Sequence, residues 1–149
     1  MTSMLNRVTE AWTKAWGAGE TAAFERLVAP DYVRQSKTGP EGLAQVMEQI
    51  QESHRAFSDF QVTVLRALED ENLVAIHWET AGKHTGDFMG VPPTGRTVTV
   101  QGASFISHQD GVITSESVVW DPREMLSSMS IWHLGDQRSP RRKVQNNAN

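Results

Sequence analysis

Apolar residues in the first third of the chain recur at intervals of three and four, which is the spacing of an amphipathic helix. This pattern predicts helices over about residues 3–16, 20–29 and 40–53, with a short extended segment at 31–33. Glycine and proline residues separate these segments, because neither residue continues a helix readily. The apolar faces are formed by Leu5, Val8, Trp12, Ala15 and Trp16, by Phe24, Leu27 and Val28, and by Leu43, Val46, Met47 and Ile50.

From Phe60 onward the apolar period changes to two, which is typical of strands. Turn-forming residues at 69–72 and 108–111 indicate hairpins between neighbouring strands. Three helices followed by an antiparallel meander indicate an α+β domain, with the helices laid across one face of a curved sheet. The strands are predicted at about residues 60–68, 72–84, 96–108 and 112–121.

Composition fits one soluble domain. The chain has 149 residues, 38% of them hydrophobic, which is enough for an apolar core. It contains no cysteine, so disulfides, a thiolate nucleophile and cysteine zinc sites are excluded. No apolar run reaches the length of a membrane span, and the first residues lack the apolar core of a signal peptide. We therefore expect a cytoplasmic protein without a membrane partner.

The formal net charge is −4, which argues against nucleic acid as the main partner. A short basic tail with a polar end is more often disordered than a binding arm. We therefore divide the chain into a folded domain, residues 1–135, and a basic, disordered tail, residues 136–149. The basic residues of that tail are Arg138, Arg141, Arg142 and Lys143.

The stretch after Gly111 carries the strongest chemical signal. Alternation from Ile113 places Asp121 at the end of a strand, and Pro122 favours the start of a helix. A carboxylate at a strand end is held rigidly and can open into a cavity that the sheet encloses. The alternative is that Asp121 caps the helix, and the two roles are compatible. Trp120 would then face the other way, into the core or a dimer interface.

Several motifs resemble the SnoaL-like polyketide cyclase family of the wider NTF2-like fold. The resemblance implies a cone-shaped α+β barrel whose pocket takes a hydrophobic, polyketide-sized molecule. It also implies that the aspartate at position 121 moves a proton in an intramolecular aldol ring closure, without metal or cofactor. A carboxyl group in an apolar pocket loses hydration, which raises its pKa and suits it to this role. The motifs are Gly39–Leu43, Phe57–Phe60, His84–Gly86, the specific loop Phe88–Arg96, Asp110–Ile113, Glu116 and Asp121.

The chain departs from the family pattern on the strand before Asp121. The cyclases that perform the aldol closure carry a glutamine and a histidine there, whereas this chain has Gly102 and Ser104. The donors that stabilise the enolate in those cyclases are therefore absent, and Ser104 is a weak substitute. We expect this change to open the pocket.

A second constellation lies on the strand over residues 72–84. His77 and Glu79 share one face of that strand and are similar to the Arg-x-Asp pair of the related limonene epoxide hydrolases. This resemblance predicts that His77 and Glu79 face Asp121 across the pocket. The alternative is a solvated strand face, and a metal-binding triad of the same residues is not favoured.

Other residues are expected to line the pocket or to support it. Tyr32 and Arg34 lie where family members often place a pocket-facing polar residue, and His84 is expected to steady the following loop by a hydrogen bond. The predicted substrate-binding residues are Tyr32, Gln35, Met47, His54, Phe88, Met89, Gly102, Ser104, Val119 and Met125.

These observations predict a cofactor-independent polyketide tailoring enzyme, a cyclase that uses Asp121 as general acid and base. No metal or cofactor is expected, and the partners are a hydrophobic small molecule and a second copy of the chain. The alternatives are an epoxide hydrolase or epoxide-opening cyclase, a pericyclic or shape-only cyclase, a hydroxylase, and a non-catalytic module that binds hydrophobic ligands.

Overall fold

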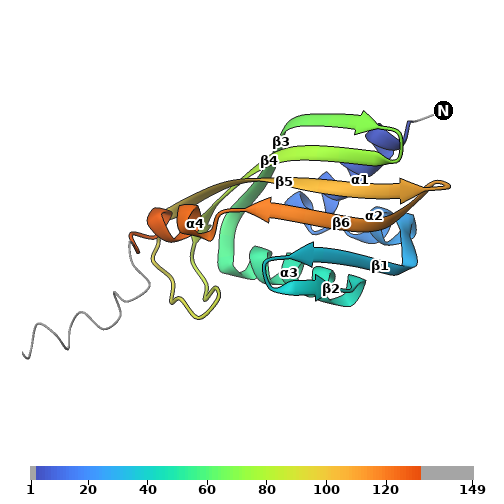
Figure 1. Ribbon diagram of the computed structural model, residues 1–149. Coiled ribbons are helices and arrows are strands. Elements are labelled where there is room, and N and C mark those ends of the chain that lie inside the picture. The colour runs from blue at the N-terminus through green and yellow to red at the C-terminus, as the bar shows by residue number, and fades with distance from the viewer. Residues whose placement is uncertain (1–2, 132–149) are drawn as a thin grey trace, which may run out of the picture.

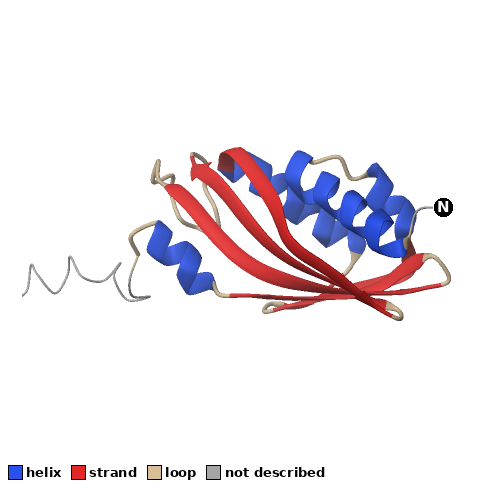
Figure 2. Cartoon of the chain, turned by 90° about the horizontal axis from the view of Figure 1, so that it is seen from above, coloured by secondary structure: helices blue, strands red, loops and turns tan. Residues whose placement is uncertain are grey.

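The computed structural model describes residues 3–131, and the predicted basic tail lies outside the described residues. One curved six-stranded sheet carries helices on one face (Figures 1 and 2). The strand order is β2-β1-β6-β5-β4-β3, which confirms the predicted α+β class. The elements are α1 (Met4–Ala18), α2 (Ala22–Leu27), β1 (Val28–Ser36), β2 (Gly39–Glu41), α3 (Leu43–Ala56), β3 (Phe57–Asp70), β4 (Leu73–His84), β5 (Thr97–Gln109), β6 (Val112–Trp120) and α4 (Pro122–Ser128).

The helices pack their predicted apolar faces on the sheet. In α1, the Ser3 side chain caps the first turn, and Gly19 ends the helix with a φ of 73°, which glycine adopts without strain. The stripe that α1 buries contains Val8 and Trp12, and α3 buries Val46 and Ile50. Figure 2 shows α1, α2 and α3 together on one side of the sheet, with α4 apart at one end. None of the described helices is long and apolar enough to cross a membrane.

The predicted meander is present, and two further strands extend it. The strands β3 to β6 pair antiparallel in chain order, as the alternation predicts. The short extended segment at 31–33 is part of a nine-residue strand, β1, which pairs parallel with β6. Gly39 and Pro40, predicted to begin a helix, form the edge strand β2 instead, and α3 starts at Leu43. Proline is tolerated there because an edge strand does not need every backbone donor.

A bulge in β6 reverses the faces that strict alternation predicts. Ser107 pairs with Ser115, but His108 pairs with Ile113, so Thr114 is an extra residue in the ladder. Ile113 is buried, and beyond the bulge the buried positions are Glu116 and Val118. The residues that follow therefore alternate in the opposite sense to the prediction.

Candidate active site

A cavity of about 280 Å³ lies between the inner face of the sheet, the helices α1 and α3, and the loop that connects β4 with β5. This volume is close to the lower end of the range for small-molecule sites, roughly 300–1,000 Å³. Seven aromatic residues contribute to its largely apolar wall, and polar groups gather at the end near β1 and β2. The aromatic residues are Trp12, Trp16, Phe57, Phe60, Trp78, Phe88 and Trp120.

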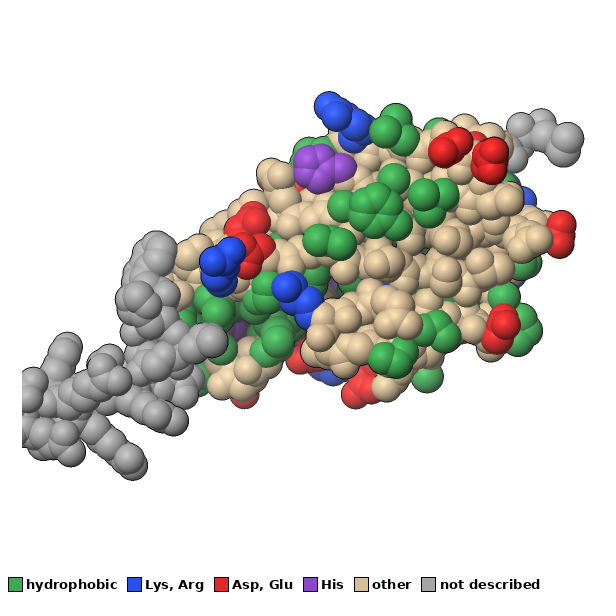
Figure 3. Space-filling view, in the orientation of Figure 1, with side chains coloured by type: hydrophobic (Ala, Val, Ile, Leu, Met, Phe, Trp, Pro, Cys, Tyr) green, Lys and Arg blue, Asp and Glu red, His purple; other side chains and the backbone are tan. Residues whose placement is uncertain are grey.

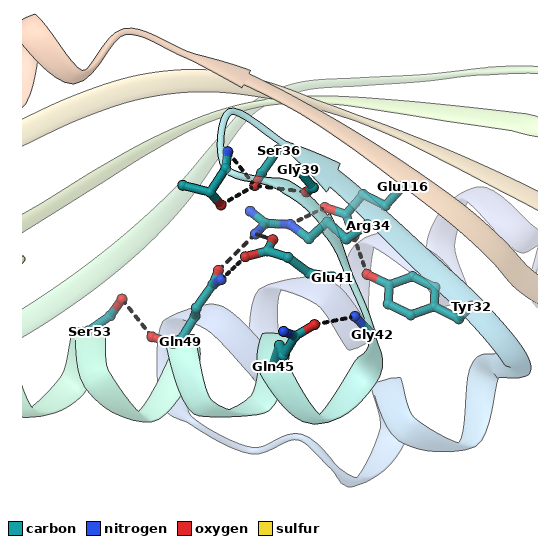
Figure 4. Close-up of polar contacts among 11 residues, drawn as sticks. Tyr32, Arg34, Ser36, Gly39, Glu41, Gly42, Gln45, Gln49, Ser53 and Glu116 are labelled. Atoms are coloured by element: carbon teal, nitrogen blue, oxygen red, sulfur yellow. Dashed lines mark hydrogen bonds and ion pairs between the residues drawn. The ribbon is translucent and has the colours of Figure 1, made fainter.

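The polar end of the cavity is built on three neighbouring strands. In the sheet register, Arg34 of β1 lies beside Glu41 of β2 and Glu116 of β6. Arg34 Nη1 donates to Glu41 Oε1 at 3.2 Å and to Gln49 Oε1 of α3 at 2.9 Å. Gln49 also donates to the other oxygen of Glu41. Figure 4 shows these side chains pointing toward one another from β1, β2, β6 and α3.

Tyr32 and Glu116 complete this group. Tyr32 donates its hydroxyl hydrogen to Glu116 Oε1 at 3.1 Å, and Glu116 Oε2 lies 3.7 Å from Arg34 Nε. Burial, with the negative charge of Glu116 beside it, raises the pKa of Tyr32 well above its usual range. We refer to Tyr32, Arg34, Glu41, Gln49 and Glu116 as the arginine cluster.

The arginine cluster is buried and carries an excess of negative charge. Arg34, Glu41 and Glu116 are 8%, 7% and 2% exposed, so one guanidinium neutralises only one of two buried carboxylates. Burying charges is costly even when they are paired, so such a group is weak support for stability and a good candidate for function. Arg34, Glu41 and Gln49 all line the cavity, where a bound molecule can reach them.

Two tryptophans of α1 line the cavity, and one of them contacts Arg34. The Arg34 guanidinium lies 5.0 Å from the ring centroid of Trp16, which is a cation–π contact. The indole N–H groups of Trp12 and Trp16 are buried and find no acceptor in the described part of the chain. A buried donor without a partner is costly to stability.

The structure places Asp121 away from the cavity, which corrects the prediction. Because of the bulge in β6, Trp120 lines the cavity and Asp121 does not. The Asp121 side chain is 47% exposed, caps α4 by accepting from Arg123 N at 2.9 Å, and pairs with Arg123 Nη2 at 3.0 Å. Hydrogen bonds from Arg123 lower the pKa of Asp121, opposite to the expected direction. The alternative role as a helix cap is therefore confirmed.

His77 and Glu79 also lie outside the cavity wall. The buried residues of β4 are Ile76 and Trp78, and His77 is exposed on the other face. Glu79 accepts a hydrogen bond from Gln101 at 3.0 Å, near the surface. The predicted constellation facing Asp121 across the pocket is thus wrong, and the solvated strand face is correct. Among residues 3–131, no three histidine or carboxylate side chains are grouped to hold a metal ion.

The predicted substrate-binding residues divide into two sets. Phe88, Met89, Ser104 and Met125 line the cavity, and Tyr32 belongs to the arginine cluster behind its wall. The others do not line it, because their strands or helices turn them away or another side chain covers them. These are Gln35, which is exposed, Met47, which is half-buried, His54, which contacts the Trp16 carbonyl oxygen at 2.8 Å, Val119, which is 59% exposed, and Gly102.

Gly102 does not open the cavity. Trp78, directly opposite on β4, fills the space above it and donates its indole N–H to Ser104 Oγ at 3.1 Å. The indole of Trp78 thus covers Gly102, whereas Ser104 beside it still lines the cavity. The expectation of a wider pocket is wrong, because a neighbouring side chain takes the space.

The loop between β4 and β5 brings Phe88 and Met89 to the cavity. His84, fully buried, accepts a hydrogen bond at Nδ1 from the Thr94 backbone N–H at 3.2 Å, and its own backbone bonds to Gly95 and Arg96. These contacts join the two ends of the loop, so His84 has the predicted role of steadying it.

Part of the site has no clear signal in the sequence. Gln49 and Trp16 fit the pattern of ordinary helix residues, and strict alternation along β6 predicts that Trp120 faces away from the cavity. Glu41 and Glu116 were recognised only as family positions, without a role. The signal that joins them is the pairing of β1 with β2 and β6, which depends on strands far apart in the sequence.

The curved sheet, the helices on one of its faces and the cavity between them define an NTF2-like α+β protein. The sequence profile of the SnoaL-like polyketide cyclase matches residues 6–128, and the chain belongs to that family. None of the curated proteins is similar enough in sequence to count as a match.

Solved structures agree with this assignment. The chain is similar to AclR from Streptomyces galilaeus, proposed to be a hydroxylase, with 25% identity and a TM-score of 0.75 over 86% of this chain and 98% of that one. It is also similar in fold to IdmH from Streptomyces antibioticus, proposed to be a polyketide cyclase, with 24% identity, a TM-score of 0.74 and coverage of 87% and 99%. TsrD from Streptomyces laurentii shares the fold at 15% identity, with a TM-score of 0.78 and coverage of 86% and 96%.

Proposed function

We propose that the protein is a cytoplasmic, cofactor-independent tailoring enzyme that closes a ring in a hydrophobic polyketide intermediate. The observation that carries this proposal is an aromatic cavity that ends in the arginine cluster, in a chain of the SnoaL-like family. Aromatic walls bind an apolar carbon skeleton, and the few polar groups at one end fix its orientation.

The reaction that fits this arrangement is an intramolecular aldol addition. A base removes a proton from a carbon between two carbonyl groups, and the resulting enolate carbon attacks a second carbonyl carbon of the same molecule. A carbon–carbon bond forms, the carbonyl double bond opens, and the new alkoxide takes the proton back from the base. A donor near the enolate oxygen stabilises its charge, and the Arg34 guanidinium, which lines the cavity, is suited to this task.

Glu41 is the carboxylate best placed to move the proton. It lines the cavity, and its hydrogen bonds with Arg34 and Gln49 hold it in one orientation. A carbon acid between two carbonyls needs only a modest base, so a carboxylate that also pairs with an arginine is sufficient. Glu41 therefore takes the role that the sequence hypothesis gave to Asp121.

Asp121 is the second candidate for the base. It follows Trp120, which lines the cavity, and the family resemblance assigns proton transfer to its position. To act on a bound molecule, its side chain would have to leave Arg123 and turn toward the cavity mouth. A comparison of Glu41→Gln with Asp121→Asn decides between the two carboxylates.

A turnover experiment with isotopic labels tests the proposed function. A polyketide with a 1,3-dicarbonyl unit is incubated with the protein in ¹⁸O-labelled water or under ¹⁸O₂, and the products are analysed by mass spectrometry. Ring closure gives a product with the mass of the substrate, or that mass less one water, and no added oxygen atom. Glu41→Gln is the matched variant, because the amide keeps the size and one acceptor of the carboxylate.

Each alternative leaves a different signature in that experiment. A net gain of one water molecule by a probe that carries an epoxide indicates epoxide hydrolysis, and binding without any product indicates a carrier. Equal activity of the wild type and both carboxylate variants indicates a cyclase that acts by shape alone. Each of these results would overturn the proposed acid–base cyclisation.

Hydroxylation is a second candidate function, because AclR, at 25% identity, is proposed to be a hydroxylase. In that reaction one oxygen atom of O₂ enters the product and the other is reduced to water by two electrons, which an electron-rich hydroquinone-type substrate would supply. Incorporation of label from ¹⁸O₂ therefore distinguishes it from cyclisation in the same experiment.

We also propose that the outer face of the sheet joins two copies of the chain. Leu68, Phe105 and Val119 are exposed on strands β3, β5 and β6, and Figure 3 shows apolar side chains gathered over this face. Phe105→Lys is expected to shift the protein from dimer to monomer in light scattering, whereas Ala44→Lys, on an exposed position of α3, leaves the mass unchanged. A monomeric wild type would contradict this proposal.

A further inference from the structure

The floor of the cavity depends on one tryptophan that lies across a neighbouring strand. Trp78 belongs to β4, and its side chain reaches over β5 from Gly102 to Ser104. Its indole N–H donates to Ser104 Oγ, and Ser104 is 1% exposed. One end of the indole is thus fixed by a buried hydrogen bond.

Gly102 makes this position of the indole possible. A Cβ atom at residue 102 would lie 2.4 and 2.5 Å from Cζ2 and Cη2 of Trp78, and 2.8 Å from the Val119 carbonyl oxygen. These distances are far below van der Waals contact, so any other residue at position 102 forces Trp78 to move. The absence of one side chain therefore determines where another one lies.

Trp78 is part of a continuous aromatic wall. The Trp12 ring lies 6.3 Å from it with an interplanar angle of 36°, and both rings line the cavity. Because Trp78 is held on one side by β5 and on another by Trp12, it has little freedom to adapt to the shape of a bound molecule. A rigid aromatic surface favours molecules that match its flatness.

We propose that Gly102 and Ser104 are specificity-determining residues, which hold Trp78 as a flat platform that selects flat, conjugated ring systems over saturated ones. Trp78 is 8% exposed, so only part of the indole faces the cavity; a conjugated ring can lie flat against that part, whereas a puckered saturated ring touches it at fewer atoms. This inference rests on the proposed function in one respect only, which is that the selected molecule is the substrate.

Calorimetric titration of the purified protein with a matched pair of probes tests the platform. The probes are anthracenecarboxylic acid and its perhydro derivative, which share a carbon skeleton and a carboxylate but differ in planarity. We expect the wild type to bind the flat probe roughly tenfold more tightly. In Trp78→Leu and Gly102→Ala, the preference is expected to fall below about threefold, since the stacking surface is removed or displaced.

Two further variants keep the result interpretable. Ser104→Ala removes the hydrogen bond without adding an atom, so it reports on the platform even if Gly102→Ala does not fold, and it is expected to lower the preference. Gly17→Ala is the matched control, because a Cβ there meets Val62 at an ordinary 3.5 Å. Equal affinity of the two probes for the wild type, or an unchanged preference in Trp78→Leu and Ser104→Ala, would overturn the inference.

Binding and turnover separate this inference from the proposed function. A preference for the flat probe without any ring-closed product would contradict the proposed function and leave the platform supported. Ring closure without any preference for the flat probe would contradict the platform and leave the proposed function supported.

Discussion

Glu41 and Asp121 are two carboxylates that each pair with an arginine, yet their surroundings are opposite. Glu41 is 7% exposed, lines the cavity and shares its arginine with Gln49 and Glu116. The Asp121 side chain is 47% exposed, and its partner Arg123 is 88% exposed. The same kind of charged pair therefore lies in two different environments, buried at one end of the cavity in one case and exposed at the start of α4 in the other.

Burial determines how strongly an arginine–carboxylate pair interacts with a bound molecule. In the arginine cluster, little water screens the charges, so their interactions with a bound molecule are strong. At Asp121, water and salt screen the ion pair, and exposed pairs of this kind contribute little. An arginine–carboxylate pair becomes a catalytic candidate only where the fold excludes water.

The largest expected effect comes from removing the cation of the arginine cluster. Arg34→Met leaves Glu41 and Glu116 buried without a counter-charge, which we expect to destabilise the protein by about 3–5 kcal/mol. Urea unfolding measures the loss, and Arg123→Met is the control, with no resolvable change expected. A similar small effect of both variants would mean that the two arginines are in equivalent surroundings.

The two carboxylates are expected to differ next in turnover. Glu41→Gln should lower kcat by roughly a hundredfold or more, because it removes the proton acceptor in the cavity. Asp121→Asn should change kcat by less than about threefold, since the amide oxygen still caps α4. Steady-state rates and probe binding are measured for both variants, and the reverse order of effects would restore Asp121 as the base.

A spectroscopic titration tests the burial of the arginine cluster. Tyr32 is the only tyrosine in the chain, so tyrosinate absorbance reports on it alone. Its folded pKa is raised above the unfolded value of about 10, so the neutral form is retained and stability falls as pH rises above about 10. Tyrosinate should therefore form only as the protein unfolds, and ionisation in the folded protein near pH 10 would show that the cluster is open to water.

The smallest effect concerns the exposed pair. Arg123 lowers the pKa of Asp121, so the contribution of this pair to stability is present above the unfolded pKa and is lost as pH falls through the lower folded value. In Arg123→Met, the pKa of Asp121 should rise toward about 3.9, which carbon-detected NMR can follow. An unchanged pKa would show that the cap of α4 alone sets it.

Local patterns were sufficient to predict the helices and the four long strands. The stripe of Val8 and Trp12 and the period of two after Phe60 report on burial within one element, and burial is read directly from spacing. The loop motif and His84 also predicted which fold these elements form, because they resemble a known family. Elements whose pattern lies within a few residues are therefore accessible from the sequence.

Local patterns did not predict which side chains of β6 face inward, and they did not predict the arginine cluster. A bulge at Thr114 leaves no clear mark in the alternation, yet it determines whether Trp120 or Asp121 faces inward. The cluster joins Tyr32 to a partner 84 residues later, and this proximity depends on strand pairing that local spacing does not contain. Prediction from the sequence therefore fails where a side chain's position depends on the register between strands that are far apart in the chain.

The parallel pairing of β1 with β6 also has a consequence for how the site is assembled. Arg34 and Glu41 leave the ribosome early, whereas Glu116 and the strand that covers them come near the end of the domain. Contacts between distant parts of a chain carry a large loop-closure cost. A nascent chain that stops short of β6 lacks Glu116 and the strand that pairs with β1, so the charged end of the cavity cannot be complete before β6 is made.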